Sequence, residues 1–394
     1  MFDTMLPSAV LLGVAALWRI GKGGAGRGAW LALGLALGLG VLAKGPVVLV
    51  HLLPLVLTMR LWAPAPPRFG QAARGLGLAI AAGLAVVAVW LVPALVTMDP
   101  AVRHELLWTQ SAARVAGGLE HDRPVWFFAA LLPLLLFPWG WSWRLWRGVA
   151  ETFRADPAAR LCAVWAVSGL VLFSLISGKQ AHYLIPEFPA MALIFARALG
   201  RPGQGARGGS LAALPVALLG LAALGLAAGL VPAGGALAEL APRWPVALTG
   251  VLCLFLAAAA LRLGAVAAHL ALGLGLMAAL HLPIAATALG AHHDTHPVAE
   301  RLAAAAPGGL ALVGLPNHAQ FSFAAGLAAP VATPLDAAAL AAWAAAHPDG
   351  TIFGPVALAG IAARPAATEP SYVGEIGFWP AALLLNVPEP GPSG

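Results

Sequence analysis

Ten apolar segments occupy most of residues 1–290, and they constrain the possible folds more than any other feature. They cover residues 5–18, 29–43, 46–62, 76–98, 124–143, 160–178, 187–200, 209–231, 245–261 and 264–288. Hydrophobic residues make up 60% of the 394 residues and charged residues only 10%, which leaves too few polar side chains to cover a water-soluble globule. Several segments are shorter than the ~20 residues of a perpendicular span, so we expect tilted helices or local thinning of the bilayer. The sequence predicts an all-α polytopic membrane protein with about ten spans.

Basic residues are unevenly divided between the two sets of alternate connections. One set holds fourteen of the 22 lysines and arginines, but only Glu151 and Asp156 of the sixteen acidic residues. Because short cytoplasmic loops collect positive charge, this set is predicted to face the cytoplasm. Both ends of the chain are therefore predicted to lie on the outer side.

The turn at Lys44, Gly45 and Pro46 decides this topology, because residues 29–62 could instead form one long crossing. A single crossing would reverse every later segment and abolish the bias in positive charge. Gly45 tolerates unusual backbone dihedrals and Pro46 donates no backbone hydrogen bond, so a tight reversal suits this position. We therefore predict a hairpin whose turn faces outward.

The sequence changes character after residue 290, where glycines and prolines separate short periodic stretches. Two stretches are predicted as helices and four as strands: helices at residues 297–306 and 336–347, and strands at 309–315, 351–355, 371–378 and 382–387. Residues 1–290 are thus predicted to form a transmembrane domain. Residues 291–394 form a small α/β domain, large enough to fold as a unit and outside by parity.

Polar residues interrupt the apolar pattern at two outer turns. Lys44 follows a nearly unbroken apolar run, so it either extends its amine to water or holds an anion. The second turn, SGKQAHYLIPEFP, places Lys179, His182 and Tyr183 within five positions. Simple anchoring at the membrane interface by Tyr183 and Lys179 is the alternative to a binding role.

The outer loop of residues 99–123 shows apolar positions at helical spacing, which predicts an amphipathic helix lying along the interface. Its charged residues can be read as a solvated face. Arg114 differs, because it starts from the apolar side of this helix and could present a planar guanidinium to a lipid phosphate.

Other polar or reactive groups carry less functional signal. Residues 292–296 (HHDTH) are spaced too tightly for most of them to reach one ion, so we read them as a hydrated linker and expect no metal there. Cys162 and Cys253 lie inside apolar segments and are expected to pack as small hydrophobic residues. There is no phosphate-binding P-loop, nucleophile elbow or dinucleotide motif. We expect no nucleic-acid partner.

Three segments together resemble the protein mannosyltransferase-like superfamily, and in particular its bacterial aminoarabinose transferase-like glycosyltransferases. They are GLALGLGVLAKGPVVL (34–49), HELLWTQSAARVAGGLEHDRPVWFFAALLPLLLFPW (104–139) and FSLISGKQAHYLIPEFPAMAL (173–193). The resemblance implies a GT-C fold that transfers a sugar from a polyprenyl-phosphate carrier to a lipid or protein acceptor, as in lipid A modification. It implies multi-pass insertion in the bacterial inner membrane, with the C-terminal domain in the periplasm and membrane lipids as partners.

The resemblance also implies roles for individual residues. Lys44 matches the family's KGP lysine, Arg114 the outer-loop arginine that contacts the carrier phosphate, and Tyr183 a tyrosine lining the donor cavity. Lys179 and His182 match the frame around that tyrosine and are grouped with the substrate-binding residues. Asp3 matches an acid that heads a middle span, and it is the candidate catalytic residue. The donor sugar is carried on polyprenyl phosphate and no tightly bound cofactor is implied; the sequence leaves a divalent metal open.

The family's first span, its long first outer loop and the next two spans have no counterpart in this sequence. That loop carries the acidic motif regarded as the catalytic base, so an N-terminally truncated chain, inactive by itself, is the expectation. A lipid or solute transporter is the main alternative, although transporters place their charged sites near the middle of the bilayer. A scaffold protein acting through its outer domain would need no convergent cationic cavity.

Overall fold

A computed structural model describes residues 2–98, 103, 123–200, 210–232 and 234–385. The chain forms two compact units. The first unit comprises Met1–Leu214 with Ala257–Gly273, and the second comprises Pro215–Leu256 with Leu274–Gly394. Residue 290, where the sequence predicts a domain boundary, lies inside α15 (Ala288–His293), before the sheet begins at Leu310; the two predicted domains stay a prediction.

Helices account for every predicted apolar segment. Along the chain they are α1 (Phe2–Gly21), α2 (Arg27–Lys44), η1 (Gly45–Val47), α3 (Val48–Leu57), α4 (Met59–Trp62), α5 (Phe69–Thr97), α8 (Phe127–Leu135), η3 (Trp139–Trp141), α9 (Trp143–Ala155), α10 (Pro157–Leu175), η4 (Ala181–Glu187), α11 (Phe188–Leu199), α12 (Ser210–Ala227), η5 (Gly235–Glu239), α13 (Trp244–Ala260), α14 (Ala265–Ala286) and α15 (Ala288–His293). Prolines inside α5, α8, α12 and α14 remove backbone donors within these helices.

Five helical stretches in the described part of the chain are long and apolar enough to cross a bilayer. They are Thr4–Gly21, Arg27–Leu57, Phe69–Thr97, Pro157–Leu175 and Ala265–Ala286, and shorter apolar helices occur at Leu211–Ala227 and Trp244–Ala260. The stretch Arg27–Leu57 contains the reversal at Gly45, so it provides two antiparallel segments rather than one crossing. The number of ten spans stays a prediction.

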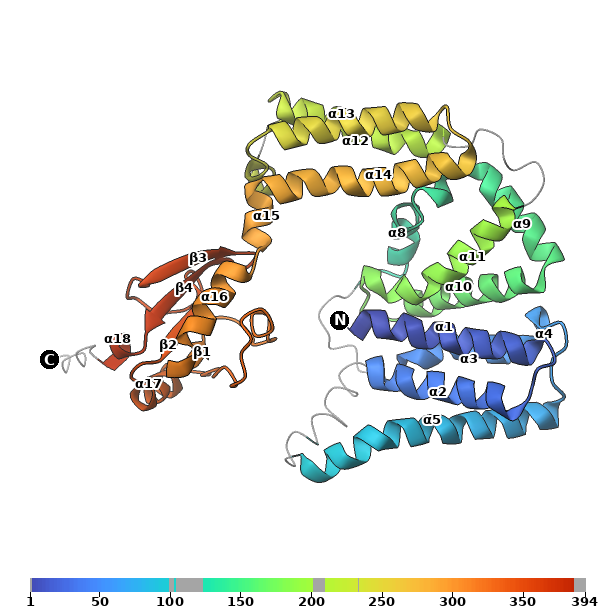
Figure 1. The fold of residues 1–394 in the computed structure, drawn as a ribbon, viewed down its shortest axis with the longest axis horizontal. Coiled ribbons are helices and arrows are strands. Elements are labelled where there is room, and N and C mark those ends of the chain that lie inside the picture. Colours follow the sequence, from blue (N-terminus) through green and yellow to red (C-terminus); the bar gives the residue numbers. More distant parts are fainter. Residues whose placement is uncertain (1, 99–102, 104–122, 201–209, 233, 386–394) are drawn as a thin grey trace. The chain divides into compact units, whose positions relative to one another are not determined.

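The predicted hairpin after Lys44 is confirmed. A side chain added at Gly40 of α2 would strike Val48 of α3, so residues on either side of Gly45 pack against each other. Figure 1 shows α2 and α3 running side by side in opposite directions. Gly45 has a φ of 69°, in the left-handed region that glycine adopts without the steric cost of a side chain.

Small residues allow α2 and α5 to approach closely. A Cβ atom added at Gly34 of α2 would lie 2.5 Å from the carbonyl oxygen of Ala79 on α5. Gly75 of α5 in turn lies against the indole of Trp30, which is 4% exposed. Close backbone approach of this kind strengthens dispersion contacts where lipid removes the usual hydrophobic driving force.

We expect Gly34→Ala to lower the melting temperature of the purified protein in detergent. The new methyl group meets backbone, which cannot move aside as a flexible side chain can, and such overpacking costs about 1–3 kcal/mol. Gly28→Ala on the same helix is the matched control, because its Cβ would meet nothing within 4 Å. Equal melting temperatures for the two variants would contradict the close packing of α2 on α5.

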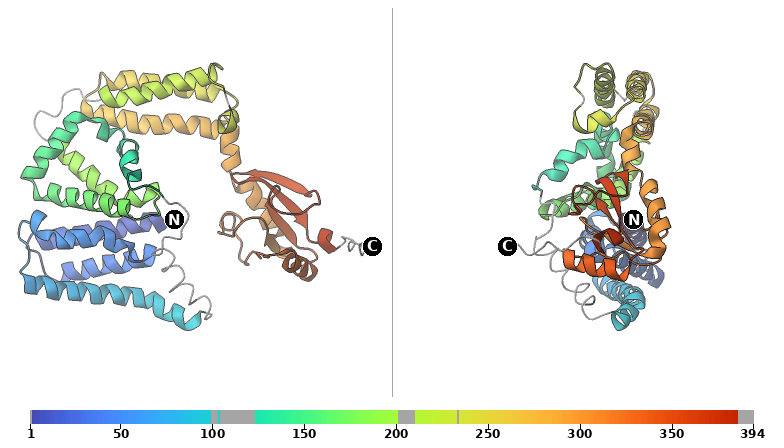
Figure 2. Two further views of the ribbon diagram at one scale, coloured as in Figure 1. Left: turned by 180° about the vertical axis from the view of Figure 1, so that it is seen from behind. Right: turned by 90° about the vertical axis from the view of Figure 1, so that its left-hand side faces the viewer.

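The C-terminal part of the second unit is a four-stranded sheet in the order β1-β2-β4-β3. Its strands are β1 (Leu310–Leu312), β2 (Thr351–Pro355), β3 (Ala367–Ser371) and β4 (Gly374–Pro380), and only β1 and β2 pair in parallel. Helix α16 (His296–Ala305) covers one face, where Leu302 packs with Phe353. Helices α17 (Ala337–Ala346) and α18 (Ala382–Leu385) cover the other, where Ile352 packs with Trp379. Figures 1 and 2 show this sheet from two sides.

The structure corrects the predicted sheet in three places. Residues 382–385, predicted as the start of a strand, form α18, because a short apolar run fits a helix as well as a strand. Strand β3 was not predicted, since its sequence ATEPS has low strand propensity and a proline, which an edge strand tolerates. The predicted strand at 371–378 begins later, at Gly374.

The predicted orientation can be tested by cysteine labelling in intact cells. Leu335 in the C-terminal domain is 98% exposed, and Arg154 near the end of α9 is also exposed. A membrane-impermeant maleimide is expected to label Leu335→Cys and to leave Arg154→Cys unlabelled until the cells are lysed. Cys162 and Cys253 are buried and provide little background. Equal protection of the two new cysteines would overturn the predicted topology.

Candidate functional site

Lys44 and Tyr183 lie far apart in the sequence but meet in the first unit. Lys44 ends α2 at the hairpin turn, and its Nζ lies 5.0 Å from the centroid of the Tyr183 ring. Tyr183 belongs to η4, the short helix that follows the SGKQ turn. A cation over an aromatic ring is attracted by the negative face of the ring. The fold thus brings together two of the predicted substrate-binding residues.

The Tyr183 ring is held among other rings. His182 meets it edge-on with centroids 5.0 Å apart, and Phe173 of α10 approaches it at 5.7 Å. The Tyr183 backbone N–H donates a hydrogen bond to the Gln180 carbonyl at 3.0 Å. His182 therefore contacts Tyr183 directly, and both rings are only partly buried.

Lys179 has a structural partner. Its side chain is buried, 3% exposed, and its Nζ donates to the carbonyl oxygen of Arg123 at 2.7 Å. The Arg123 N–H donates in turn to the Ser177 carbonyl at 3.2 Å. These two hydrogen bonds fasten the SGKQ turn to the chain just before α8. A direct contact of Lys179 with substrate stays a prediction.

The side chains of two predicted site residues lie outside the described part of the structure. Arg114 lies outside the described residues. Asp3 belongs to the first turn of α1, but its side chain is also outside the described part. Arg123, which the sequence analysis did not select, supplies an exposed cation beside the same turn, with its Cζ 5.9 Å from the Phe127 ring centroid.

A buried histidine and glutamate form a pair that the sequence analysis missed. His51 of α3 is 0% exposed and Glu187, the last residue of η4, is 4% exposed. Nδ1 of His51 lies 2.5 Å from Oε1 of Glu187. Phe173 packs on His51 as well as on Tyr183, with centroids 5.3 Å apart. Ionisable residues inside apolar segments are rare, and that signal could have drawn attention to both.

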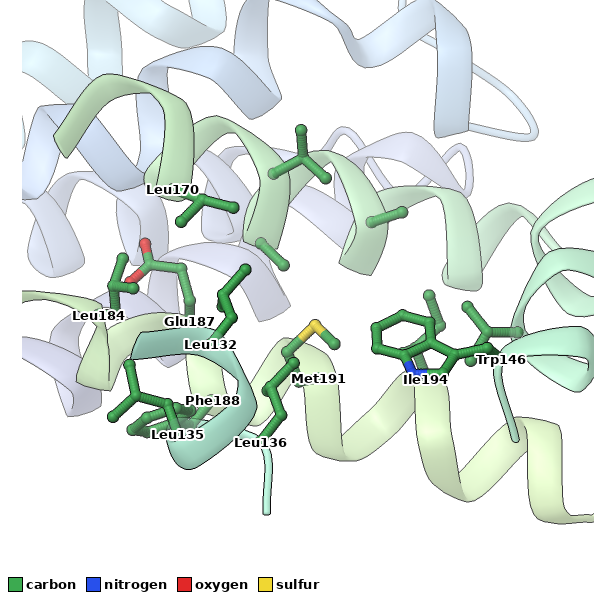
Figure 3. A pocket seen from close by; sticks show the side chains of 14 residues that line it. Leu132, Leu135, Leu136, Trp146, Leu170, Leu184, Glu187, Phe188, Met191 and Ile194 are labelled. Atoms are coloured by element: carbon green, nitrogen blue, oxygen red, sulfur yellow. The ribbon is translucent and has the colours of Figure 1, made fainter. Parts of the chain in front are cut away.

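Glu187 also borders an apolar cavity of about 250 Å³ between α8, α9, α10 and α11. Figure 3 shows its carboxylate at one end, beside Leu170 and Leu184, with Met191 and Ile194 further along. The remaining lining residues are hydrophobic, so the cavity suits a hydrocarbon chain. Leu184 directly follows Tyr183. One end of this cavity therefore lies beside the aromatic cluster of Phe173, His182 and Tyr183.

The opposite end of the first unit carries a comparable cation. Lys22 follows α1, and its Nζ lies 5.8 Å from the Trp18 ring centroid. Lys22 also pairs with Ala65 in an isolated bridge, before α5 begins. Lys44 ends α2, and Lys22 lies in the connection that precedes α2; the side of the membrane that each one faces stays a prediction.

Two histidines of the HHDTH segment pair with acidic side chains. His296 donates from its backbone to Asp294 at 3.0 Å and its ring lies 2.7 Å from the same oxygen, and these hydrogen bonds lower the pKa of Asp294. His292 lies 3.1 Å from Oε2 of Glu239. The described residues contain no group of three histidine, cysteine or acidic side chains that could hold a metal ion.

Comparison with known structures identifies the fold. ArnT from Cupriavidus metallidurans bound to undecaprenyl phosphate matches with a TM-score of 0.69 and 19% identity, covering 96% of this chain and 74% of ArnT. The apo form of ArnT matches with a TM-score of 0.66 and 20% identity, covering 98% of this chain and 75% of ArnT.

Sequence comparison gives relatives of the same kind. An undecaprenyl phosphate-alpha-4-amino-4-deoxy-L-arabinose arabinosyl transferase of Pseudomonas paraeruginosa is 33% identical over 229 residues, which are 55% of this chain and 40% of the relative. The transferase of the same name from Pseudomonas aeruginosa strain UCBPP-PA14 is 34% identical over 228 residues, with the same two shares. The chain has the GT-C fold of ArnT and is similar in sequence to aminoarabinose transferases.

The match to ArnT confirms the predicted fold class, a polytopic membrane bundle with a small C-terminal α/β domain. No protein-family profile matches the chain. The sequence matches span less than half the length of the curated relatives.

Proposed function

We propose that this chain is a membrane glycosyltransferase that takes a sugar from a polyprenyl-phosphate carrier and passes it to a lipid or protein acceptor. The contact between Lys44 and Tyr183 carries the proposal, because it puts a cation and an aromatic ring at one turn at the end of the helical bundle. The reaction takes place at the periplasmic face of the inner membrane. The C-terminal α/β domain lies in the periplasm.

The two parts of the carrier match two features of the first unit. Its phosphate suits Lys44, since a charge-assisted contact gains strength away from bulk water. Arg123 supplies a second cation near the same turn, and Arg114 is the further one that the sequence predicts. The carrier's isoprenoid chain suits the apolar cavity that begins beside Leu184. One short helix, η4, contributes to both features.

The acceptor hydroxyl needs a base, and Asp3 is the candidate carboxylate that this sequence offers. Such a base contributes typically about 10²- to 10⁴-fold to the rate. His182 and Tyr183 line the donor side, while Lys179 holds the turn that carries them. The donor is itself the activated sugar, so the chain's own residues need only bind, orient and accept a proton.

A transporter of lipids or solutes is the second candidate. The buried pair of His51 and Glu187 favours it, because ionisable residues inside a membrane bundle often mark a transport path. Accumulation or flipping of a fluorescent polyprenyl phosphate by vesicles containing the protein, without any sugar transfer, would support the transporter instead.

The proposal is tested by binding measurements on the protein in nanodiscs. Undecaprenyl phosphate is expected to bind at least about tenfold more tightly than undecaprenol, since a contact to a charged group contributes about 1.5–3 kcal/mol. Native mass spectrometry measures both ligands in one sample. Equal affinities would show that the protein does not recognise the phosphate, and the proposed function would then be wrong.

A further inference from the structure

The buried pair of His51 and Glu187 joins the two turns that carry the candidate site. His51 follows Lys44 through η1 and the start of α3, while Glu187 follows Tyr183 within η4. The hydrogen bond between them therefore connects the chain after one site residue to the chain after the other. Both side chains are buried, so neither reaches water.

Two residues of α10 pack closely on this pair. Gly169 of α10 faces Glu187, and a Cβ atom at that position would collide with the carboxylate. Phe173, one turn further along α10, packs on His51 at 5.3 Å and on Tyr183 at 5.7 Å. A single helix thus makes room for the carboxylate and supports the tyrosine.

Stability alone does not account for such a pair. His51 Nε2 and Glu187 Oε2 are buried and have no hydrogen-bond partner among the described residues. Burying incompletely satisfied polar groups is costly, and replacing a buried pair by apolar residues is often neutral or stabilising. A role in fixing geometry is the better explanation, because a polar pair is satisfied in one arrangement only.

We propose that His51 and Glu187 are positioning residues that hold Lys44 against Tyr183. Neither binds the carrier phosphate; they act by fixing the start of α3 against the end of η4. The inference rests on the proposed function only where it links the position of Lys44 to phosphate binding. The geometric part can be measured without any ligand.

The double variant His51→Leu/Glu187→Leu separates positioning from stability. Either single change leaves one polar group buried without its partner, so each is expected to lower the melting temperature. The double variant removes both groups and is expected to recover most of that loss. Its affinity for undecaprenyl phosphate should stay about tenfold weaker than that of the unchanged protein, within the range of coupling inside one hydrogen-bonded network.

Lysine labelling provides the readout that needs no ligand. The chain has three lysines, Lys22, Lys44 and Lys179, so acetylation by limiting acetic anhydride can be mapped by peptide mass spectrometry. The double variant is expected to raise the labelling rate of Lys44 several-fold and to leave Lys22, at the other end of the helices, unchanged. Gly169→Ala, which keeps both polar residues but displaces the carboxylate, should have the same effect.

His269→Leu is the matched control, because His269 is a buried histidine, 1% exposed, that stacks on Trp139, whereas His51 packs on Phe173. It should alter the melting temperature without altering Lys44 labelling. Unchanged Lys44 labelling in both the double variant and Gly169→Ala would overturn the positioning role, whatever the ligand data show. Raised labelling in a protein that never binds undecaprenyl phosphate would instead support positioning and contradict the proposed function.

Discussion

Replacing Lys44 by methionine is expected to weaken undecaprenyl phosphate binding by about 10- to 100-fold, because one charged contact contributes about 1.5–3 kcal/mol. Methionine keeps the unbranched apolar stem and the helix propensity of lysine, so the end of α2 should form as before. Affinity is measured in nanodiscs by native mass spectrometry.

Lys22→Met is the matched control for this change. Lys22 directly follows a helix and lies over an aromatic ring, but at the opposite end of the helices from Tyr183. We expect it to leave the affinity unchanged. Equal effects of the two substitutions would mean that net charge attracts the lipid phosphate, and the assignment of Lys44 would be wrong.

Phe173→Ala is expected to have the largest effect on stability among the site variants. The ring is 4% exposed and packs on both His51 and Tyr183, and removing a buried phenylalanine costs about 3–5 kcal/mol. Thermal unfolding in detergent should show a large fall in melting temperature. Affinity for undecaprenyl phosphate, measured well below that temperature, should also fall because Tyr183 loses its support.

Phe69→Ala is the control, because Phe69 is 85% exposed at the start of α5 and loses few contacts. It should change the melting temperature little. If the Phe173→Ala protein has the same melting temperature as the unchanged chain, α10 does not support the aromatic cluster.

The helical part of the fold could be predicted because its determinants are visible along the sequence. The distribution of lysine and arginine predicts the reversal at Gly45, and the packing of Gly40 on Val48 confirms it. The sheet was less predictable. Strand β3 is stabilised by pairing with β4, so its own residues carry little strand signal. Residues 382–385 show the converse, an apolar run that forms a helix.

The candidate site was predicted only in part. Lys44 and Tyr183 belong to motifs that a family resemblance can point to, and the structure adds their contact. The pairing of His51 with Glu187 depends on how α3 meets η4, which no local pattern encodes. Lys179 was selected as a substrate contact, yet its hydrogen bond to Arg123 depends on a chain segment far away in the sequence.

The central claim is that the site formed by Lys44 and Tyr183 holds the phosphate end of a polyprenyl phosphate. Photo-crosslinking tests it most directly, with a polyprenyl phosphate that carries a diazirine in its first isoprene unit. After irradiation in nanodiscs and digestion, we expect the label on peptides that contain Lys44 or Tyr183, and we expect excess undecaprenyl phosphate to compete it away. Label confined to peptides from α12, α13 and α14, or label that undecaprenyl phosphate does not displace, would contradict the account.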